Sequence, residues 1–295
     1  MKYSTFNKIA KNPALAIKPL ATRGMLNFLS DESYLKLVFK AEMGKKLDLD
    51  NPKSFNEKIQ WLKLNDRKEE YIQWVDKIEA KKKAGSCIGA SHVVPIIKCW
   101  NQPSEICFDD LPELCVIKCN HDQGSTVIYR RGYTNEKSLR EHLKKCLKHN
   151  AFSETREWPY SKIQPKIFCE EYLADEIIDY KLFCFNEEPK IINIGHKSSV
   201  DNKTRITFLD LNWKPLPFQR DDFDRVVSLP DIPDCFDELL FLAKKISKGT
   251  TFVRTDFFII NNDIYFSEFT LYPTSGFIRF NPREADYEVG SWLKL

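Results

Sequence analysis

The sequence lacks several patterns that identify other classes of protein. Its nine cysteines include no C-x-x-C pair, and its five histidines form no H-x-x-x-H pattern. Neither a disulfide framework nor a zinc site is therefore indicated, and we expect reduced thiols that are mostly buried. Cys115 and Cys119 lie in an apolar stretch, where a cysteine usually serves as a small core side chain.

A strong charge of one sign and a long apolar run are also missing. The 45 Lys and Arg residues nearly balance the 42 Asp and Glu residues, which leaves a formal charge of +3. This charge is too small to indicate a nucleic-acid partner. No run approaches the roughly 20 apolar residues that a membrane span needs, and no export signal is evident. We therefore expect a cytoplasmic protein with a small-molecule partner.

The first thirty residues are nevertheless basic, with cations at Lys2, Lys8, Lys11, Lys18 and Arg23. The simpler interpretation is a solvated N-terminal helix. The alternative is a basic surface helix that associates peripherally with membrane-bound machinery.

The composition that remains is that of a folded protein, with 42% hydrophobic and 29% charged residues. A chain of 295 residues predicts two or three interlocked lobes. No internal repeat or low-complexity linker separates them.

Helical periodicity dominates the first part of the chain. Apolar residues recur at helical spacing between residues 31 and 65. Ser54, with Glu57 three positions later, predicts a capping box at the start of a helix. A further helix is predicted from Tyr71 to Lys83, with Gly85 closing it. We interpret residues 1–74 as an N-terminal helical region.

Short apolar strands dominate the rest of the chain. We predict strands over residues 93–97, 114–119, 125–129, 167–173, 180–185, 191–194, 252–260 and 264–269. Helices are predicted over residues 136–149 and 236–248. Because helices and strands are interspersed, the fold class is α+β.

The most informative segment is residues 253–270, in which two β-rich runs flank a polar turn. A three-residue loop centred on Asn262 would place two pairs of residues opposite each other on one face. These pairs are Asp256 with Glu268 and Arg254 with Thr270.

Two directly opposed carboxylates repel each other unless a cation or a shared proton lies between them. Mg²⁺ is the natural cation, because it prefers oxygen ligands from one or two carboxylates together with substrate phosphates. A two-residue turn would instead flip the register and separate the acids. The residues alone leave both registers open.

A second segment, V-I-K-C-N-H-D-Q-G-S-T, places Val116, Lys118 and Asn120 on one face of a strand before a polar turn. A lysine on an apolar strand needs an anionic partner, and the amides of Gly124 and Ser125 are suited to phosphate oxygens. The alternative is an edge-strand lysine that only blocks aggregation.

A third segment, K-I-F-C-E-E-Y-L, ends an apolar strand in Glu170 and Glu171, and Asp179, Tyr180 and Lys181 open the next strand. An adenine could bond to the strand backbone here, with an acid reaching its ribose hydroxyls. The alternative is a solvated strand end.

Five strings occur in order. The first covers residues 30–63, from S-D-E-S-Y-L to S-F-N-E-K-I-Q-W-L-K, and the others are V-D-K, V-I-K-C-N-H, C-E-E-Y-L with D-Y-K-L-F-C-F, and R-T-D-F with S-E-F-T-L-Y-P-T-S-G-F. Together they resemble the ATP-grasp superfamily, and more closely its TupA-like branch, which is found with polysaccharide and teichuronopeptide biosynthesis. The resemblance implies two α+β lobes that grip ATP. Beyond the helical region, residues 75–113 would begin the ATP-grasp region, 114–174 form its small lobe and 175–295 its C-terminal lobe with the metal site.

The resemblance also implies roles for individual residues. ATP would be bound by Lys77, Lys118, His121, Gly124, Ser125, Glu170, Glu171, Tyr172, Leu173 and Lys181. Mg²⁺ would be bound by Asp256, Glu268 and Thr270, where Thr270 replaces a more usual Asn. Lys181 and Arg254 are the catalytic candidates, because fixed cations stabilise charge on a carboxylate or a transferred phosphoryl group.

The activity implied is that of an ATP-dependent carboxylate-amine ligase that acts through an acyl phosphate. The acceptor carboxylate would be a uronic acid of a surface polysaccharide precursor, and the amine an amino acid. Two alternatives remain: a kinase that phosphorylates a sugar hydroxyl, and a non-catalytic nucleotide-binding partner of a glycosyltransferase complex. The sequence departs from the family pattern at Asp122-Gln123 in the phosphate turn and at Glu187, where a hairpin glycine is usual.

Overall fold

The computed structural model describes residues 17, 19–21, 23–122, 124–175, 177–197 and 203–295. Four of the five cations of the predicted basic N-terminal helix, Lys2, Lys8, Lys11 and Lys18, lie outside these residues. Beyond residue 30 the chain forms the helices α3 (Asp31–Met43), α4 (Phe55–Asn65), α5 (Glu70–Val75) and α6 (Lys77–Ile88). None of the described helices is both long and apolar enough to cross a bilayer.

Capping side chains explain where these helices begin. The Ser54 side chain and Glu57 form the predicted capping box at the start of α4. The single helix predicted from Tyr71 to Lys83 is wrong, because the Asp76 carboxylate accepts bonds from the amides of Ile78 and Glu79 and starts a new helix there. That helix, α6, also continues past Gly85.

The smaller of the two main sheets is antiparallel and has the order β1-β4-β2-β3. Its strands are β1 (Ile96–Trp100), β2 (Leu114–Cys119), β3 (Val127–Arg130) and β4 (Ile167–Glu171). Helix α7 (Glu136–Cys146) packs on it through Leu139 and Leu143. The strand predicted at 93–97 lies three residues later, and Val93 instead bridges to Phe266 of the larger sheet.

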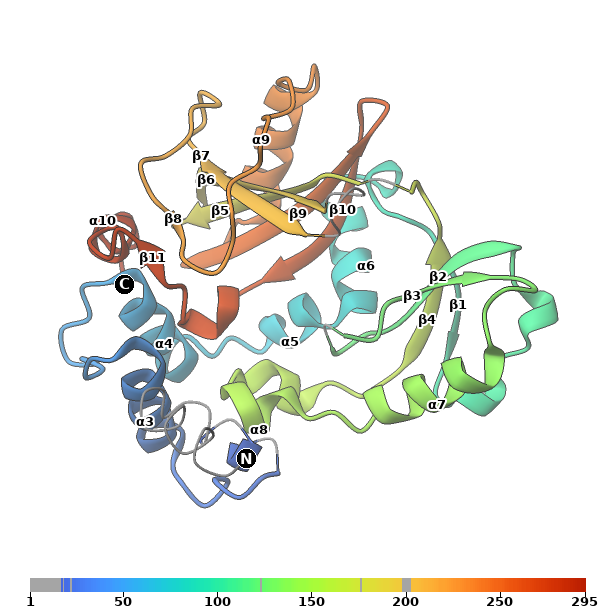
Figure 1. The fold of residues 1–295 in the computed structure, drawn as a ribbon, viewed down its shortest axis with the longest axis horizontal. Coiled ribbons are helices and arrows are strands. Elements are labelled where there is room, and N and C mark those ends of the chain that lie inside the picture. Colours follow the sequence, from blue (N-terminus) through green and yellow to red (C-terminus); the bar gives the residue numbers. More distant parts are fainter. Residues whose placement is uncertain (1–16, 18, 22, 123, 176, 198–202) are drawn as a thin grey trace.

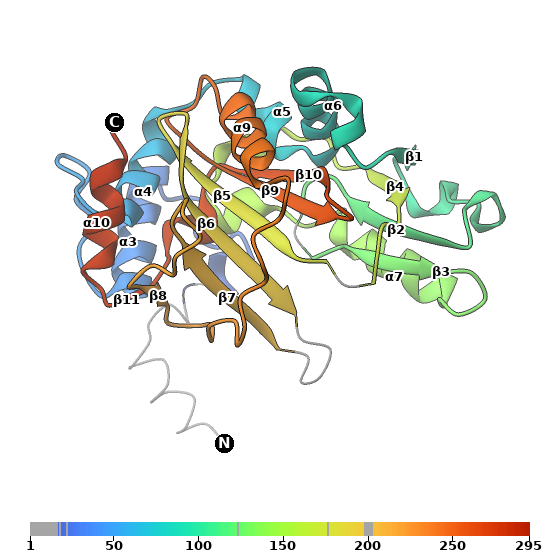
Figure 2. The same cartoon turned by 90° about the horizontal axis from the view of Figure 1, so that it is seen from above.

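The larger sheet has the order β10-β9-β5-β6-β7, and all of its pairings are antiparallel. Its strands are β5 (Asp179–Phe185), β6 (Glu188–Lys197), β7 (Thr204–Leu209), β9 (Phe252–Ile260) and β10 (Asp263–Thr270). Helix α9 (Phe236–Ile246) covers one face (Figures 1 and 2). Strand β7 was not predicted.

Shorter elements complete the chain. They are α8 (Ala151–Thr155), α10 (Ala285–Trp292), a small sheet of β8 (Gln219–Arg220) with β11 (Phe280–Asn281), and 3₁₀ turns at Ala90–His92, Pro103–Glu105, Phe108–Asp110, Trp158–Lys162 and Pro273–Gly276. Helix α10 lies against α4 at the closest approach that glycine allows, because a Cβ on Gly290 would lie 2.3 Å from the Lys53 carbonyl oxygen.

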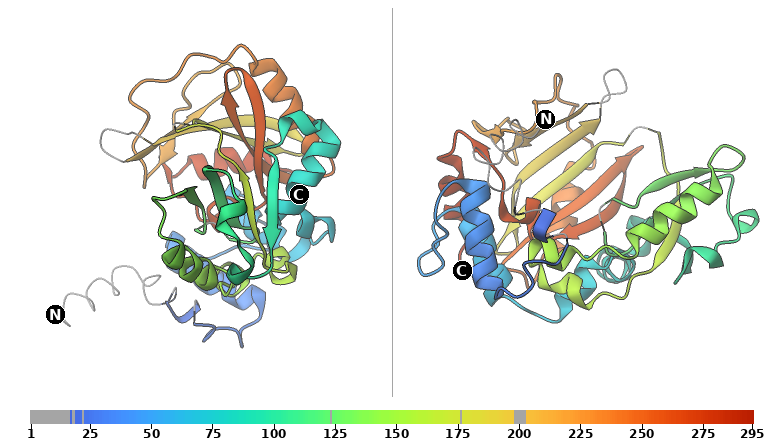
Figure 3. Two further views of the ribbon diagram at one scale, coloured as in Figure 1. Left: turned by 90° about the vertical axis from the view of Figure 1, so that its right-hand side faces the viewer. Right: turned by 60° about the horizontal axis from the view of Figure 1, so that its bottom comes forward.

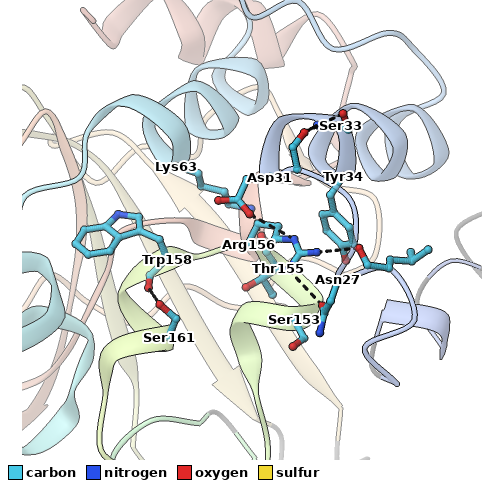
Figure 4. A network of polar contacts seen from close by, with 12 residues as sticks. Asn27, Asp31, Ser33, Tyr34, Lys63, Ser153, Thr155, Arg156, Trp158 and Ser161 are labelled. Carbon is cyan, nitrogen blue, oxygen red and sulfur yellow. Dashed lines mark hydrogen bonds and ion pairs between the residues drawn. The ribbon is translucent and has the colours of Figure 1, made fainter.

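The N-terminal helices are joined to the middle of the chain by a buried arginine (Figure 4). Arg156 donates to the Leu26 carbonyl at 3.0 Å, and its guanidinium lies 4.4 Å from the centre of the Tyr34 ring. The Tyr34 hydroxyl donates to the Glu154 carbonyl at 2.6 Å. Residues 151–163 therefore connect α3 to the small sheet.

The two sheets lie on either side of α5 and α6 (Figure 1). Seen from below, α3 lies on one side of the large sheet and α7 on the other (Figure 3). At one end of the large sheet, Phe55 of α4 packs on the rings of Phe185 and Phe252, with centroids 5.9 and 5.1 Å away. Helix α4 is thereby fixed on the face opposite α9.

All nine cysteines are free. Cys115 and Cys119 are fully buried on the core side of β2, as predicted. The broader expectation was wrong, because only four of the nine thiols are buried and Cys99 and Cys107 are exposed.

Candidate functional site

A row of five residues crosses the large sheet from one edge to the other. Register pairs Glu268 with Asp256, Asp256 with Lys181, Lys181 with Asn193, and Asn193 with Phe208. Directly paired residues of an antiparallel sheet point to the same face. The row therefore places two acids and a cation side by side on the face away from α9.

The turn and strand pairing of the β9–β10 hairpin differ from those predicted. The predicted three-residue loop is wrong, because Asp263 pairs with Ile260 and leaves a two-residue turn. Both turn residues, Asn261 and Asn262, have positive φ, as in the tight turns that favour hairpins.

A β-bulge between Phe266 and Glu268 then restores the predicted pairing of Asp256 with Glu268. Without the bulge, Ser267 would face Asp256, and Glu268 would face the buried core residue Thr255. The predicted facing of the two acids, and of Arg254 with Thr270, is confirmed.

Cations surround the paired acids. Arg254 contacts both oxygens of Asp256, at 2.7 and 2.5 Å, and lies 3.7 Å from Glu268. Lys181 Nζ lies 4.0 Å from Asp256 and 2.6 Å from Asp179. The structure thus brings together both predicted catalytic cations and both predicted metal-binding acids.

The pKa values of the two acids respond differently to this environment. Burial raises the pKa of Asp256, and Arg254 and Lys181 only partly oppose it. Burial acts in the same direction on Glu268, but Lys77 and Arg254 outweigh it and lower the pKa of that carboxyl. The site therefore holds ionised Glu268 beside an Asp256 that is fixed by a two-point contact.

The lysines of α6 and β2 meet at Glu170 of β4. Lys118 forms an ion pair with Glu170, and Lys81 lies 3.0 Å from it. Burial would raise the pKa of Glu170, but the two lysines lower it overall. The alternative interpretation, a solvated strand end, is correct only for Glu171, which is exposed. Glu170 is buried.

Lys81 was not among the predicted site residues. It lies one helical turn after Lys77 on α6, so its spacing from the V-D-K string was an available signal. Lys77 itself links residues of the two sheets, because its Nζ lies 3.5 Å from Glu268 of β10 and donates to the carbonyl of Asp122, which follows β2, at 2.7 Å.

The predicted phosphate turn is shaped by its own side chains. Asp122 accepts from the Ser125 amide at 3.1 Å and from the Ser125 hydroxyl, which in turn accepts from the Cys119 amide at 2.7 Å. Gly124 is exposed, and Gln123 lies outside the described residues. The carboxylate of Asp122, a departure from the family pattern, is therefore used inside the turn.

The remaining nucleotide candidates lie around this turn and at the end of β4. His121 is buried, and burial lowers the pKa of its imidazole. Strand β4 ends at Glu171, so the strand predicted through Leu173 is two residues too long. Tyr172 follows the strand, and its hydroxyl donates to Asp175 at 2.5 Å. The other departure, Glu187, has a φ of 73°, the left-handed backbone that favours glycine.

A strained turn that was not predicted follows β10. Thr274, Ser275 and Gly276 have successive φ values of 49°, 54° and 70°. The side chain of Lys63, which is fully buried, donates to the Ser275 carbonyl and hydroxyl at 2.9 and 2.8 Å. Gln60 donates to the same carbonyl and to that of Gly276, both at 2.9 Å. Helix α4 therefore holds this turn in place beside Arg254, with which Thr274 lines one cavity.

Within the described part of the chain, no group of three or more His, Cys, Asp or Glu side chains is placed to hold a metal ion. Asp256 and Glu268 nevertheless offer two facing carboxylates, and Thr270 lies two residues beyond Glu268 on the same strand. Two carboxylates with further oxygens from a substrate phosphate are a donor set that suits Mg²⁺. The residues present therefore fit that ion.

The family model described as TupA-like ATPgrasp matches residues 57–294. Among solved structures, D-alanine-D-alanine ligase from Helicobacter pylori matches with a TM-score of 0.44 and 15% identity, over 81% of this chain and 69% of that chain.

D-alanine-D-alanine ligase from Bacillus anthracis, complexed with ATP, matches with a TM-score of 0.40 and 17% identity, over 67% of this chain and 55% of that chain. The ATP-grasp ligase PsnB, complexed with minimal precursor, matches with a TM-score of 0.36 and 12% identity, over 67% and 52%. The chain thus spans little more than half the length of these two ligases. A search of the curated proteins found no significant match.

Proposed function

The chain belongs to the TupA-like ATP-grasp family, and on this premise we propose that it is an ATP-dependent carboxylate-amine ligase. The observation that carries the proposal is the row that sets Glu268, Asp256 and Lys181 side by side, with Arg254 bound to Asp256. It combines acids for a metal with cations for a transferred phosphoryl group.

The nucleotide would lie between the two sheets. Lys77 and Lys118 would contact its phosphates, and the turn with His121, Gly124 and Ser125 would close over them. The Lys77 contacts with the Asp122 carbonyl and Glu268 support this placement, because they join the turn to the acids. The backbone from Glu170 to Leu173 would lie along the adenine, while the carboxylate of Glu170 holds Lys118 and Lys81 in position.

Asp256 and Glu268, with the Thr270 hydroxyl, would hold Mg²⁺. When bound, the ion neutralises negative charge on the phosphate oxygens. The cations beside it, Lys181 and Arg254, stay fixed by Asp179 and Asp256. They need little rearrangement as charge develops on the transferred group.

The reaction proceeds in two displacements. An acceptor carboxylate oxygen, held by Arg254 and Lys181, attacks the γ-phosphorus of ATP, the bond to the β-phosphate oxygen breaks, and ADP leaves. The resulting acyl phosphate is attacked at its carbonyl carbon by an amine, which loses a proton as the amide forms and phosphate leaves. Arg254 suits this role because its planar guanidinium matches carboxylate and phosphate geometry.

From the setting of the family, the acceptor would be a uronic acid of a surface polysaccharide precursor and the amine an amino acid. This is tested by measuring MgATP-dependent ADP release with UDP-hexuronic acids, with and without an amino-acid mixture. Release that requires both co-substrates, and that disappears in Glu268→Ala, is expected.

Release with the sugar alone, unchanged by the amine, would favour the kinase over the ligase. ATP binding without release in any mixture would support the non-catalytic nucleotide-binding partner.

A further inference from the structure

A cavity of about 160 Å³ continues from the charged row along the same face of the large sheet. Its floor is formed by Lys181, Asn193 and Phe208, which are paired across β5, β6 and β7. Arg254 lines it beside the acids. Sites for drug-sized ligands commonly measure roughly 300–1,000 Å³, so the size of this cavity suits a single ring rather than a whole nucleotide.

The cavity walls combine positive charge with apolar rings. Three cations and one carboxylate line it: Lys181, Arg220, Arg254 and Asp179. The lining also includes the aromatic rings of Phe183, Phe208 and Phe223 and the uncharged polar groups of Asn193, Thr204 and Thr274. Apolar faces with a few converging polar groups are typical of a small-molecule site. Lys181, Arg220 and Arg254 each pair with a carboxylate, and each of these side chains has further N–H groups that can bind an anionic occupant.

Arg220 is held more firmly than an ordinary surface arginine. It donates to both oxygens of Asp222, at 2.9 and 2.6 Å, and to the Thr274 hydroxyl at 3.0 Å. Its guanidinium also lies 4.7 Å from the centre of the Phe223 ring. A guanidinium has five N–H groups. The three bonds to described residues use three of these N–H groups, so two remain for a ligand. The side chain that carries them is already fixed in position.

On the basis of the proposed function, we infer that Arg220 binds a phosphate ester on the acceptor ring while Arg254 and Lys181 hold its carboxylate. In the proposed reaction the acceptor carboxylate lies at Arg254, because Asp256 and Glu268 would hold Mg²⁺ and the transferred phosphoryl group there. Arg220 then meets a second substituent of the same ring, and a guanidinium with two N–H groups to offer matches phosphate geometry. The acceptor class is a phosphorylated sugar acid. A sugar 1-phosphate and a nucleotide-linked sugar share this chemistry.

The test measures binding to the full chain by calorimetry, with ADP and Mg²⁺ present. The probes are glucuronic acid, glucuronic acid 1-phosphate and UDP-glucuronic acid. The wild type is expected to bind the esters about 10-fold or more tightly than the free acid, the gain that charge-assisted hydrogen bonds give. Equal affinity for the two esters indicates recognition of one phosphate, and tighter binding of UDP-glucuronic acid indicates recognition of the nucleotide-linked form.

Arg220→Gln is expected to remove the preference for the esters, and Arg220→Lys to retain part of it. Arg279→Gln is the matched control, because Arg279 pairs with the neighbouring Asp221 at 3.4 Å but does not line this cavity. A preference that persists in Arg220→Gln, equal wild-type affinity for acid and esters, or no binding of any probe would overturn the inference. Binding with the expected preference but without ADP release would instead contradict the proposed ligase activity.

Discussion

Arg254 binds both carboxylate oxygens of Asp256 and lies 3.7 Å from the facing Glu268. One buried cation thus compensates two carboxylates that would otherwise repel each other across the hairpin. Lys77 and Lys181 add positive charge from either side. Consequently, the protein can fold with this acid pair in place before any metal or nucleotide arrives.

Removing either acid should abolish metal-dependent activity. We expect Asp256→Asn and Glu268→Gln each to lower MgATP-dependent ADP release by about 100-fold or more, the order of loss seen when one fixed charge-stabilising group is removed. Asp263→Asn, in an exposed residue at the end of the same hairpin, serves as the control and should retain activity. Wild-type turnover by Glu268→Gln at every Mg²⁺ concentration would contradict the metal assignment.

Glu170 should matter for both stability and nucleotide binding. In Glu170→Gln, the buried Lys81 loses its ionised partner, and breaking such a pair typically costs about 3–5 kcal/mol. Urea unfolding should show this loss, and ATP titration should show weaker binding because Lys118 is no longer held. The double variant Lys81→Met with Glu170→Gln should regain stability but not ATP affinity.

The same ion pairs predict an acid-side loss of stability. Lys118 and Lys81 lower the pKa of Glu170 below its ordinary value of 4.5. The stabilisation is therefore fully present above the unfolded-state pKa and is lost as the pH falls through the lowered folded-state pKa. Unfolding free energies measured between pH 7 and pH 3 should fall less steeply in Glu170→Gln than in the wild type.

Lys63 should make stability rise with pH as well, but in the alkaline range. Burial lowers its pKa to about 8 from 10.5, so between these values the unfolded chain binds more protons and stability rises with pH. Unfolding measured from pH 7.5 to 10.5 should show this rise in the wild type and less of it in Lys63→Met. Lys40→Met, in an exposed residue of α3, should retain the full rise. Parallel profiles for the wild type and Lys63→Met would contradict the prediction.

Gly44 and Gly276 have the same φ of 70°, so replacing each by Ala distinguishes the cost of backbone strain from the cost of crowding. A Cβ on Gly276 would lie 2.4 Å from Gln60 Nε2 and 2.7 Å from Ile59 Cγ2, whereas a Cβ on Gly44 would meet nothing within 4 Å. Gly44→Ala should cost about 1–2 kcal/mol from the left-handed backbone. Gly276→Ala should cost a further 1–3 kcal/mol, roughly, from overpacking. Equal losses in thermal or urea unfolding would show that the turn at Gly276 can move away.

Patterns that depend on neighbouring residues were predictable from the sequence. Strands β2 and β9 have the predicted bounds, and the capping box at Ser54 forms as predicted. The facing of Asp256 with Glu268 was also predicted, although through a loop of the wrong length. A β-bulge has no clear signal in a run of apolar and polar residues. The combination of a two-residue turn with a bulge could therefore not be predicted.

The contacts that the sequence did not reveal join residues far apart in the chain. Lys63 and Gln60 reach Ser275 across more than 200 residues, and helical periodicity says nothing about such a partner. A buried lysine on α4 also contradicts the usual expectation that lysines are exposed. The break at Asp76 was missed because an acid inside a helical pattern resembles a surface residue until its capping bonds are seen.

The bulge at Ser267 has a consequence for how this hairpin can vary among related chains. A two-residue turn with a bulge and a three-residue turn without one bring the same acids face to face. Deleting Ser267 should remove the bulge and still leave Glu268 opposite Asp256, because Phe266 already pairs with Phe257. A related chain can therefore have a hairpin that is one residue shorter and still bring the same two acids face to face.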